Sequence, residues 1–436
     1  MKKKTTMTTA KAFAACCAVS LSVGFVLVLL LPFASNAYAM GFPGIRNRDN
    51  GGVAPLLKLE QREHSAAGAV KVVGRHRLGP NGEVDFDHPG VTISAVVTGT
   101  KTVSARMSKV GPVGVYFTVA CNGKTETIFG TSSWAPGVVQ EKIPLCSGLD
   151  PAAQTTVKIQ KITEASWNSL TIVNNYVTFH AFNGEGLELV ERNGEGDDVP
   201  KIEFLGDSIT AGFCNMCETK PSLCPAGQTN CIRQESFGSS WANLISKEFN
   251  AESHTIAWSG YGMVMNCCGG KTLMSDIYKR TLASVPSPNP KDPHGTTSEN
   301  YWNFSSWRPD AVVINLGTND RLNSRPNNIV SFNQTYLGLA MRAAKSYGAG
   351  THFFLACGPM STAYCDEVQW VVNTLMAHGV KASFLDQRGF LDGSHGPSCC
   401  GHPSASVDQA MARKGAAFIQ NIMGWNRTVT QTDLSL

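Results

Sequence analysis

The sequence predicts an α/β domain with a parallel sheet, preceded by a separate β-rich domain. From residue 201 onwards, short apolar runs alternate with stretches of helical period, which is the pattern of a parallel sheet covered by helices on both faces. Between about residues 70 and 188 the runs are short, rich in Val, Ile, Thr and aromatic residues, and separated by turn residues. This second pattern is typical of a β-sandwich or jelly roll. With 436 residues, of which 42% are hydrophobic and 16% charged, the chain is long enough for such a pair of domains.

The first 39 residues have the composition of a secretory leader. Three lysines, Lys2 to Lys4, precede an apolar run from about residue 12 to residue 33, and the stretch Ala37-Tyr38-Ala39 fits a small-residue cleavage site. The run is also long enough to cross a bilayer if it stays uncut, so a signal anchor is the alternative. Residues 40–66 are Gly-rich and polar, which predicts a linker. We expect the β-rich domain over residues 67–192 and the α/β domain over residues 199–428.

Charge and cysteine usage both agree with export. The leader contains no acidic residue and four lysines, so its removal takes Lys+Arg from 37 to 33 against 33 Asp+Glu. A net charge of zero gives no reason to expect nucleic acid or an anionic membrane as a partner. Two of the 14 cysteines fall in the leader, and the remaining even number favours disulfides. We expect a secreted monomer, with candidate glycan acceptors in N-x-S/T sequons at Asn303, Asn333 and Asn426.

The individual elements follow from these patterns. In the β-rich part, strands are predicted within residues 91–100, 113–124 and 170–182, and a disulfide between Cys121 and Cys146 is the default because no other cysteine lies there. In the α/β part, apolar runs predict strands at 201–208, 254–260, 310–317, 351–358 and 381–386, and helical periodicity predicts helices at 329–348 and 404–423.

Polar residues with complementary chemistry follow these predicted strands. "GDSIT" places Ser208 directly after the first strand, "WSGYG" ends the second in Gly260 and Gly262, "GTND" ends the third with Asn319, and "HPS" brings His402 just before the last helix. "GDS" alone is a weak signal, since Ser and Asp are also ordinary turn and cap residues. Together the residues supply a nucleophile, hydrogen-bond donors and a base, which are the parts needed for acyl transfer.

The four blocks, in this order, resemble those of SGNH (GDSL-type) hydrolases over residues 201–425. "FDHPGVTISAVVTGT" in the β-rich part, followed by "IEFLGDSITAGF", is further similar to carbohydrate esterase family two. This resemblance implies a jelly roll fused before a flavodoxin-like SGNH domain, no metal or organic cofactor, and removal of acetyl groups from xylan, glucomannan or related polysaccharides.

The resemblance also implies a role for each residue. Ser208 would be the nucleophile and His402 the general base. The oxyanion would be held by the backbone N–H of Ser208, the N–H of Gly260 and the side-chain amide of Asn319. Gly262 is the alternative for the second donor, because two glycines flank the intervening tyrosine.

The sequence departs from the family at the third triad position. SGNH enzymes usually carry Asp three residues before the catalytic His, whereas this chain has Cys399 there. We expect a Ser–His dyad in which a backbone carbonyl holds the imidazole. The rival pair is Asp392 and His395, which fits the D-x-x-H spacing but lies in a Gly/Ser-rich loop, so we favour His402.

Other residues near these blocks have a structural and a functional interpretation. Asp207 and Asp320 are expected to be structural acceptors that shape turns. Trp258 and Tyr261 are candidate sugar-stacking residues, with packing in the core as the alternative, and the same two interpretations apply to Trp302 and Trp307.

The remaining cysteines are predicted to form disulfides. An insertion soon after Ser208 carries a C-x-x-C pair and two further cysteines, for which zinc is the alternative to disulfides. Cys357 and Cys365 are close enough to pair with each other, and the vicinal pairs 267–268 and 399–400 offer a link between the second block and the histidine loop. The cysteines of the insertion are Cys214, Cys217, Cys224 and Cys231.

Three functions are compatible with these residues. The first is a secreted carbohydrate O-deacetylase. The second is another short-chain ester hydrolase or a lipase-like enzyme of the same fold. The third is a catalytically inactive glycan-binding protein, which the missing Asp keeps open.

Overall fold

The computed structural model describes residues 69–165, 172–191, 199–217, 234–322, 325–326 and 328–428. The predicted leader and linker lie outside these ranges. Among the described helices, none is both long enough and apolar enough to cross a membrane.

The N-terminal domain consists of two antiparallel sheets. One has the order β1 (Val70–Val73), β4 (Thr92–Thr98), β9 (Thr155–Lys161), β6 (Tyr116–Cys121), β7 (Lys124–Gly130), with β11 (Glu188–Val190) also paired to β4. The other has the order β2 (Arg77–Leu78), β3 (Val84–Phe86), β10 (Val177–Asn183), β5 (Thr102–Lys109), β8 (Gln140–Ser147). The predicted strands in this part correspond to β4, β6 and β10.

Alternating side chains bind the two sheets together. In β6 every second residue is buried, which directs Phe117, Val119 and Cys121 inward. They share one core with Ile93 of their own sheet and with residues of the other sheet such as Val103. The disulfide between Cys121 and Cys146 joins β6 to β8 with a Cα–Cα distance of 6.2 Å, and so links the sheets covalently.

The C-terminal domain is built on one parallel sheet. Its order is β13 (Glu252–Ala257), β12 (Lys201–Gly206), β14 (Ala311–Asn315), β17 (His352–Cys357), β18 (Ala382–Asp386). Counted along the domain this is 2-1-3-4-5, the flavodoxin-like order, and it confirms the predicted parallel sheet. The central strand β14 is buried along its whole length, as expected when helices cover both faces.

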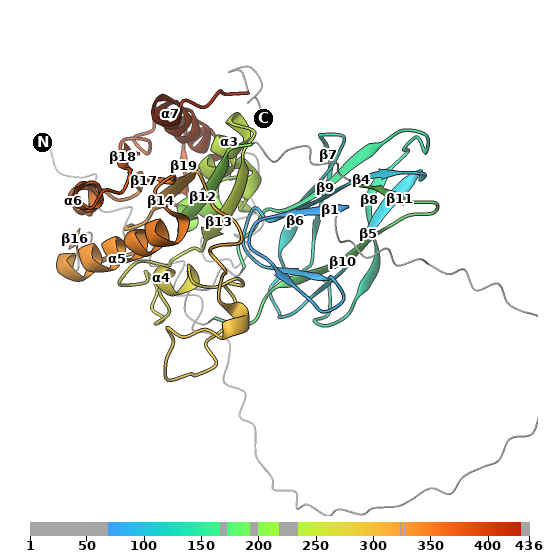
Figure 1. The fold of residues 1–436 in the computed structure, drawn as a ribbon, viewed down its shortest axis with the longest axis horizontal. Coiled ribbons are helices and arrows are strands. Elements are labelled where there is room, and N and C mark those ends of the chain that lie inside the picture. The colour runs from blue at the N-terminus through green and yellow to red at the C-terminus, as the bar shows by residue number, and fades with distance from the viewer. Residues whose placement is uncertain are drawn as a thin grey trace, which may run out of the picture.

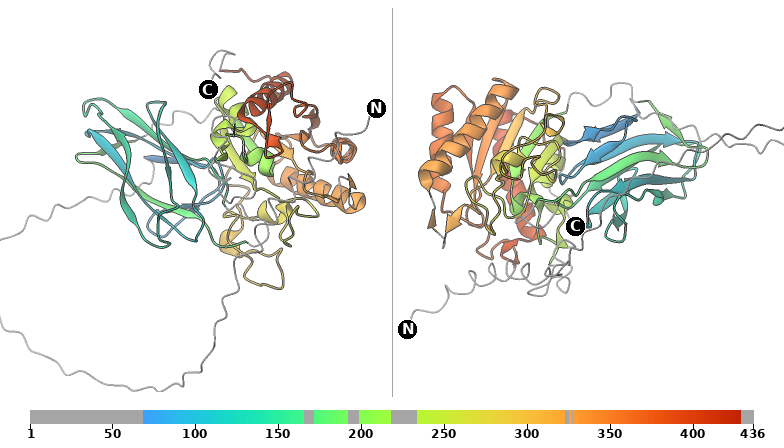
Figure 2. Two further views of the ribbon diagram at one scale, coloured as in Figure 1. Left: turned by 180° about the vertical axis from the view of Figure 1, so that it is seen from behind. Right: turned by 90° about the horizontal axis from the view of Figure 1, so that it is seen from below.

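Helices cover the two faces of this sheet. Helices α5 (Ile329–Tyr347) and α6 (Cys365–Ala377) pack into one core, whereas α3 (Trp241–Glu248) and α7 (Ala405–Met423) pack into the other. The sequence predicted α5 and α7 but not α3 or α6. Figures 1 and 2 show this domain, yellow-green to red, beside the blue-to-green sheets of the N-terminal domain.

Short elements fill the connections at the sheet edges. They are α2 (Ser208–Ala211), η4 (Phe237–Ser239), α4 (Met274–Ile277), η5 (Ser298–Asn300), and the two-residue strands β15 (Arg321–Leu322), β16 (Arg325–Pro326), β19 (Ser398–Cys399) and β20 (His402–Pro403). The hairpin of β19 and β20 carries the histidine of the last sequence block.

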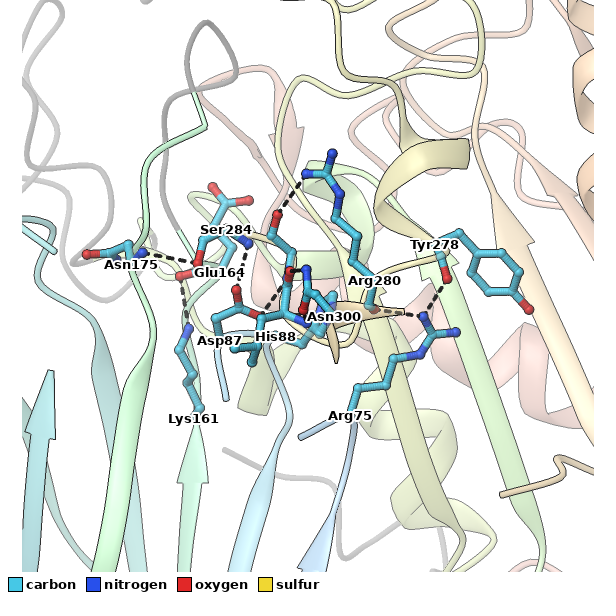
Figure 3. A network of polar contacts seen from close by, with 12 residues as sticks. Arg75, Asp87, His88, Lys161, Glu164, Asn175, Tyr278, Arg280, Ser284 and Asn300 are labelled. Carbon is cyan, nitrogen blue, oxygen red and sulfur yellow. Dashed lines mark hydrogen bonds and ion pairs between the residues drawn. The ribbon is translucent and has the colours of Figure 1, made fainter. Parts of the chain in front are cut away.

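A buried polar interface joins the two domains (Figure 3). Arg75 and Glu203 form an ion pair at 2.9 Å, and neither side chain is exposed. Asp87 accepts hydrogen bonds from the backbone N–H groups of Ala283 at 3.0 Å and Ser284 at 2.7 Å. Because buried charges are costly without such partners, these contacts fix how the domains meet.

Candidate active site

The first sequence block places Ser208 at the carboxyl end of the central strands. Strand β12 ends at Gly206, Asp207 caps α2, and Ser208 is the first residue of that short helix. A Cβ atom on Gly206 would lie 2.0 Å from Thr210 Oγ1, so glycine leaves the space that the Thr210 side chain of α2 occupies. The turn lies between β12 and β14, next to the point where the strand order reverses, which is where ligands of such sheets bind.

The structure brings His402 to Ser208. Its Nε2 atom lies 2.8 Å from Ser208 Oγ, and its Nδ1 atom lies 3.1 Å from the backbone carbonyl oxygen of Cys400. A carbonyl only accepts hydrogen bonds, so Nδ1 carries the proton and Nε2 is the unprotonated acceptor that faces the serine hydroxyl. The carbonyl therefore holds the imidazole in the tautomer that a general base requires.

The environment of His402 keeps its ring neutral. Burial lowers the pKa of His402 to about 4, although the hydrogen bond to the Cys400 carbonyl acts in the opposite direction. The residue is 6% exposed, and the ring of Phe213 packs edge-on against it at a centroid distance of 5.1 Å. At neutral pH the imidazole is thus ready to take a proton.

A disulfide anchors the histidine hairpin. Cys399 pairs with Cys217, which follows α2, across 182 residues of sequence and a Cα–Cα distance of 5.8 Å. Of the vicinal pair 399–400, Cys399 therefore does not provide the suggested link to the second block, because it is bonded to the loop after the serine. The bond holds the two loops that supply Ser208 and His402 against each other.

Two backbone N–H groups are available to bind the proposed oxyanion. Within the described residues, neither Ser208 N–H nor Gly260 N–H has a hydrogen-bond acceptor. Gly260 adopts a φ of +83°, which a residue with a side chain rarely tolerates. Gly262, the alternative donor, directs its N–H to Asn266 Oδ1 at 3.1 Å and is not available.

Asn319 ties the first two blocks together. Its Nδ2 atom donates to the carbonyl of Tyr261 at 2.8 Å and, over a longer 3.3 Å, to Asp207 Oδ2. A substrate oxyanion would have to replace the longer contact to receive this amide. The side chain is 3% exposed, so both partners reach it inside the protein.

The two aspartates of these blocks act as acceptors within the structure. Asp207 accepts from Ile209 N–H at 3.0 Å, and Asp320 accepts from the N–H groups of Val264 at 2.7 Å and Met265 at 3.1 Å. Burial raises the pKa of Asp207 to about 7 and that of Asp320 to about 6. Their contacts shape the turn at Ser208 and the loop after Gly262.

Trp258 and Tyr261 do not present their rings to a sugar. They are 0% and 1% exposed and pack against each other at 4.9 Å in the core beneath the sheet edge. The stacking role suggested for them is therefore corrected: the loop turns both side chains inward. Trp307 stacks instead on His254 at 3.7 Å, and Trp302 contacts the same imidazole at 5.6 Å.

The rival histidine is remote from this arrangement. His395 and Asp392 are both exposed, and Asp392 accepts from the N–H and hydroxyl of Ser394. The His395 ring packs on Phe390 at 5.0 Å. The structure thus brings His402, and not His395, to the serine.

The structure describes some of the other cysteines that were predicted to form disulfides, and leaves two of them outside the described residues. Cys357 pairs with Cys365 at a Cα–Cα distance of 5.3 Å. Cys214 is buried and lies beside Cys400. Over the ranges that the structure describes, no cluster of His, Cys, Asp or Glu could hold a metal ion. Cys224 and Cys231 lie outside the described residues.

Sequence reasoning missed two contributors to the site. Phe213 follows α2 within the quoted first block, but nothing in its spacing shows that it packs on a histidine 189 positions away. Glu164, in the N-terminal domain, accepts a hydrogen bond from Ser259 N–H next to Gly260. Glu164 belongs to none of the quoted blocks, and the block that ends at Phe213 gives that residue no role, so no sequence signal pointed to either contact.

A family model matches most of the C-terminal domain. The family model described as GDSL-like Lipase/Acylhydrolase matches residues 202–414, which contain all four blocks. A cellulase/esterase, CelE, from Acetivibrio thermocellus is 32% identical over 234 residues, covering 52% of this chain and 26% of that much longer protein. An acetylxylan esterase / glucomannan deacetylase from Cellvibrio japonicus is 22% identical over 381 residues, covering 82% of this chain and 89% of the relative.

Solved structures extend the likeness to both domains. A family two carbohydrate esterase from Clostridium thermocellum, in complex with cellohexaose, superposes with a TM-score of 0.68 and 28% identity over 82% of this chain and 99% of that chain. These comparisons agree with the resemblance inferred from the sequence: the solved structure is a family two carbohydrate esterase, and both curated relatives are named as esterases.

Proposed function

We propose that this chain, which carries a GDSL-like lipase/acylhydrolase domain over residues 202–414, is a secreted esterase that removes O-acetyl groups from a xylan- or glucomannan-like polysaccharide. The observation that carries the proposal is the 2.8 Å contact between Ser208 Oγ and His402 Nε2, with Nδ1 bonded to the Cys400 carbonyl. Hydrolysis of a carboxylic ester is the chemistry of the matched family and of the relatives. The substrate class follows the names of the relatives.

The reaction begins with acylation of the serine. His402 Nε2 takes the hydroxyl proton as Ser208 Oγ attacks the acetyl carbonyl carbon, and the carbonyl electrons move onto its oxygen. The N–H groups of Ser208 and Gly260, joined by the amide of Asn319, stabilise that oxyanion. The Cys400 carbonyl stabilises the imidazolium through Nδ1–H. His402 then gives its proton to the departing sugar oxygen, which leaves an acetyl-serine and a free sugar hydroxyl.

Deacylation repeats these steps with water. His402 takes a proton from a water molecule that attacks the acetyl-serine, the same donors stabilise the second oxyanion, and the proton returns to Ser208 Oγ as acetate departs. Every proton removed is returned, so the cycle consumes one water per ester and its steps use this chain's own groups.

We assign the N-terminal domain to the jelly-roll class and expect an exported monomer. Two antiparallel sheets around one core support the first assignment. Export is supported by the disulfides, which persist in oxidising compartments.

The test is acetate release from acetylated xylan and acetylated glucomannan. The wild type is compared with Ser208→Ala, His402→Ala and the matched control His395→Ala. We expect release by the wild type and by His395→Ala, and loss in both site variants. Release that survives Ser208→Ala would overturn the mechanism.

Other outcomes separate the alternative functions. Cleavage of an aryl acetate without release from either polysaccharide would keep the mechanism and discard this substrate class in favour of another short-chain ester. Binding of cellohexaose or xylan with no cleavage of any ester would establish a glycan-binding protein instead.

A further inference from the structure

Glu164 reaches from the N-terminal domain into the loop that carries an oxyanion donor. It follows β9 in the segment that crosses the domain interface, and its side chain is fully buried. Its carboxyl oxygen Oε2 accepts a hydrogen bond from the backbone N–H of Ser259. The contact links residues 95 positions apart and joins two domains.

Ser259 is the residue before Gly260. The orientation of the Ser259 backbone therefore limits the orientation of the next peptide plane, which contains the Gly260 N–H. The Gly260 N–H is open, and its carbonyl accepts from Cys267 N–H at 2.9 Å. Further along, Gly262 N–H is bonded to Asn266. After Gly260, hydrogen bonds within the C-terminal domain thus hold the loop in place. Immediately before Gly260, the hydrogen bond from Ser259 N–H to Glu164 holds it.

Glu164 is itself held on several sides. Its own N–H donates to Glu235 Oε1 of the C-terminal domain, and its carbonyl accepts from Lys161 Nζ at 2.9 Å. The next carbonyl, of Ala165, accepts from Asn175 Nδ2. Figure 3 shows Lys161, Glu164 and Asn175 within this network. These contacts fix the main chain from which the carboxyl group projects, and burial of that group limits its movement, so it can impose a direction on the amide that it binds.

The charge state of Glu164 suits a position near a developing oxyanion. Burial raises the pKa of Glu164 to about 8. This shift favours the neutral form of the carboxyl group, which accepts the hydrogen bond without adding a negative charge near the substrate. A glutamine has nearly the same shape and keeps a neutral acceptor.

We propose that Glu164 is a positioning residue for ester hydrolysis: it fixes the Ser259 amide and thereby aims the Gly260 N–H at the oxyanion. The inference rests on the proposed function for its catalytic consequence. It makes the N-terminal domain part of the catalytic apparatus, since this domain supplies a contact on which transition-state stabilisation depends.

The test compares Glu164→Met, which keeps the volume but removes the acceptor, with Glu164→Gln, which keeps the acceptor. The matched control is Asp87→Leu, because Asp87 also accepts backbone N–H groups across the same interface but at Ala283 and Ser284. On an aryl acetate we expect kcat of Glu164→Met to fall roughly 10- to 100-fold with KM nearly unchanged, somewhat less than loss of a whole oxyanion donor. Glu164→Gln and folded Asp87→Leu should keep most of kcat.

Amide hydrogen exchange gives a readout that does not depend on activity. In Glu164→Met, exchange in a peptide covering residues 257–263 should speed up, whereas Asp87→Leu should affect residues 281–285 instead. If Glu164→Met does not fold, Glu164→Asp, which withdraws the carboxyl by one methylene, should show the same effects more weakly.

The outcomes separate the two proposals. If the wild type cleaves no ester, the proposed function fails, while exchange still shows whether Glu164 fixes the loop. Equal losses of kcat in Glu164→Met and Asp87→Leu, a change confined to KM, or unchanged exchange at residues 257–263 would each overturn the positioning role.

Discussion

The activity of the wild type should persist to unusually low pH. The general base must be neutral, and burial lowers the pKa of His402 to about 4. On an aryl acetate, kcat/KM of the free enzyme should therefore hold down to about pH 5 and fall with an apparent pKa of about 4. An ordinary histidine base would lose activity near pH 6.5.

The size of this effect follows from the surroundings of the ring. Moving a pKa from 6.5 to about 4 corresponds to about 3 kcal/mol against the imidazolium. The ring is nearly excluded from water, and Phe213 packs against it. Its Nδ1 atom donates to a carbonyl group, which has only a dipole, whereas in a triad it would donate to a carboxylate with a full negative charge. Desolvation therefore outweighs the stabilisation that the carbonyl provides.

Phe213→Ala tests the cause of the shift. The smaller side chain admits water to the ring, so the acid limb of kcat/KM should move up towards 6.5, while His395→Gln should leave it in place. NMR of ¹⁵N-labelled histidine measures the same titration directly and shows which ring nitrogen carries the proton. A wild-type acid limb at about 6.5 in protein that circular dichroism shows to be folded, or a limb indifferent to Phe213→Ala, would refute this reasoning.

The pH dependence of the free energy of unfolding reports the titration of His402 less clearly than activity does. Because the folded pKa of His402 lies below its unfolded value, the unfolded chain binds more protons between about pH 4 and 6.5, and this group's contribution to the free energy of unfolding falls on acidification. Asp207 and Glu164 have raised pKa values, so their contributions are present at low pH and are lost as the pH rises towards about 7 and 8. The opposite signs mask one another in a denaturation curve.

Three further predictions concern the frame of the site. Asn319→Ala should lower kcat by roughly 10²–10³ in steady-state assays while KM changes little, and an equal loss confined to KM would contradict an oxyanion role. Replacing Cys217 and Cys399 together by Ser should cost roughly 2–5 kcal/mol of unfolding free energy and lower kcat, whereas the same change at Cys121 and Cys146 should lower the Tm alone. Arg75→Met leaves Glu203 buried without its cation and should cost roughly 3–5 kcal/mol in urea unfolding, a loss that removing Glu203 as well should partly restore.

The sequence contained enough to predict the sheet and the residues at its edge. The five predicted strands of the C-terminal domain correspond to β12, β13, β14, β17 and β18, because buried parallel strands are continuous apolar runs that end where the chain turns polar. Ser208 and Asn319 follow predicted strands, and a parallel sheet gathers its strand ends at one edge. His402 was identified from its position just before the last helix and from the resemblance of its block to the last block of SGNH hydrolases.

What the sequence did not predict depends on backbone groups and distant pairing. The partner of His402 Nδ1 is a carbonyl, which every residue possesses and no motif records. Trp258 and Tyr261 are buried and pack against each other, and residue type alone does not show which way an aromatic ring points. The Cys217–Cys399 and Glu164–Ser259 contacts span 182 and 95 positions, so only the folded chain identifies them.

The missing aspartate changes how the site achieves its geometry. In a triad one carboxylate both orients the imidazole and stabilises its charged form. Here the Cys400 carbonyl supplies orientation, but a dipole stabilises the imidazolium less than a carboxylate would. The disulfide at Cys399, which occupies the position of that aspartate, instead fixes the loop from which the carbonyl projects. The imidazole of His402 is thus well oriented, but its cationic form is weakly stabilised, so stabilisation of the transition state depends more on the oxyanion donors. For this reason a contact as remote as that between Glu164 and Ser259 N–H should affect kcat.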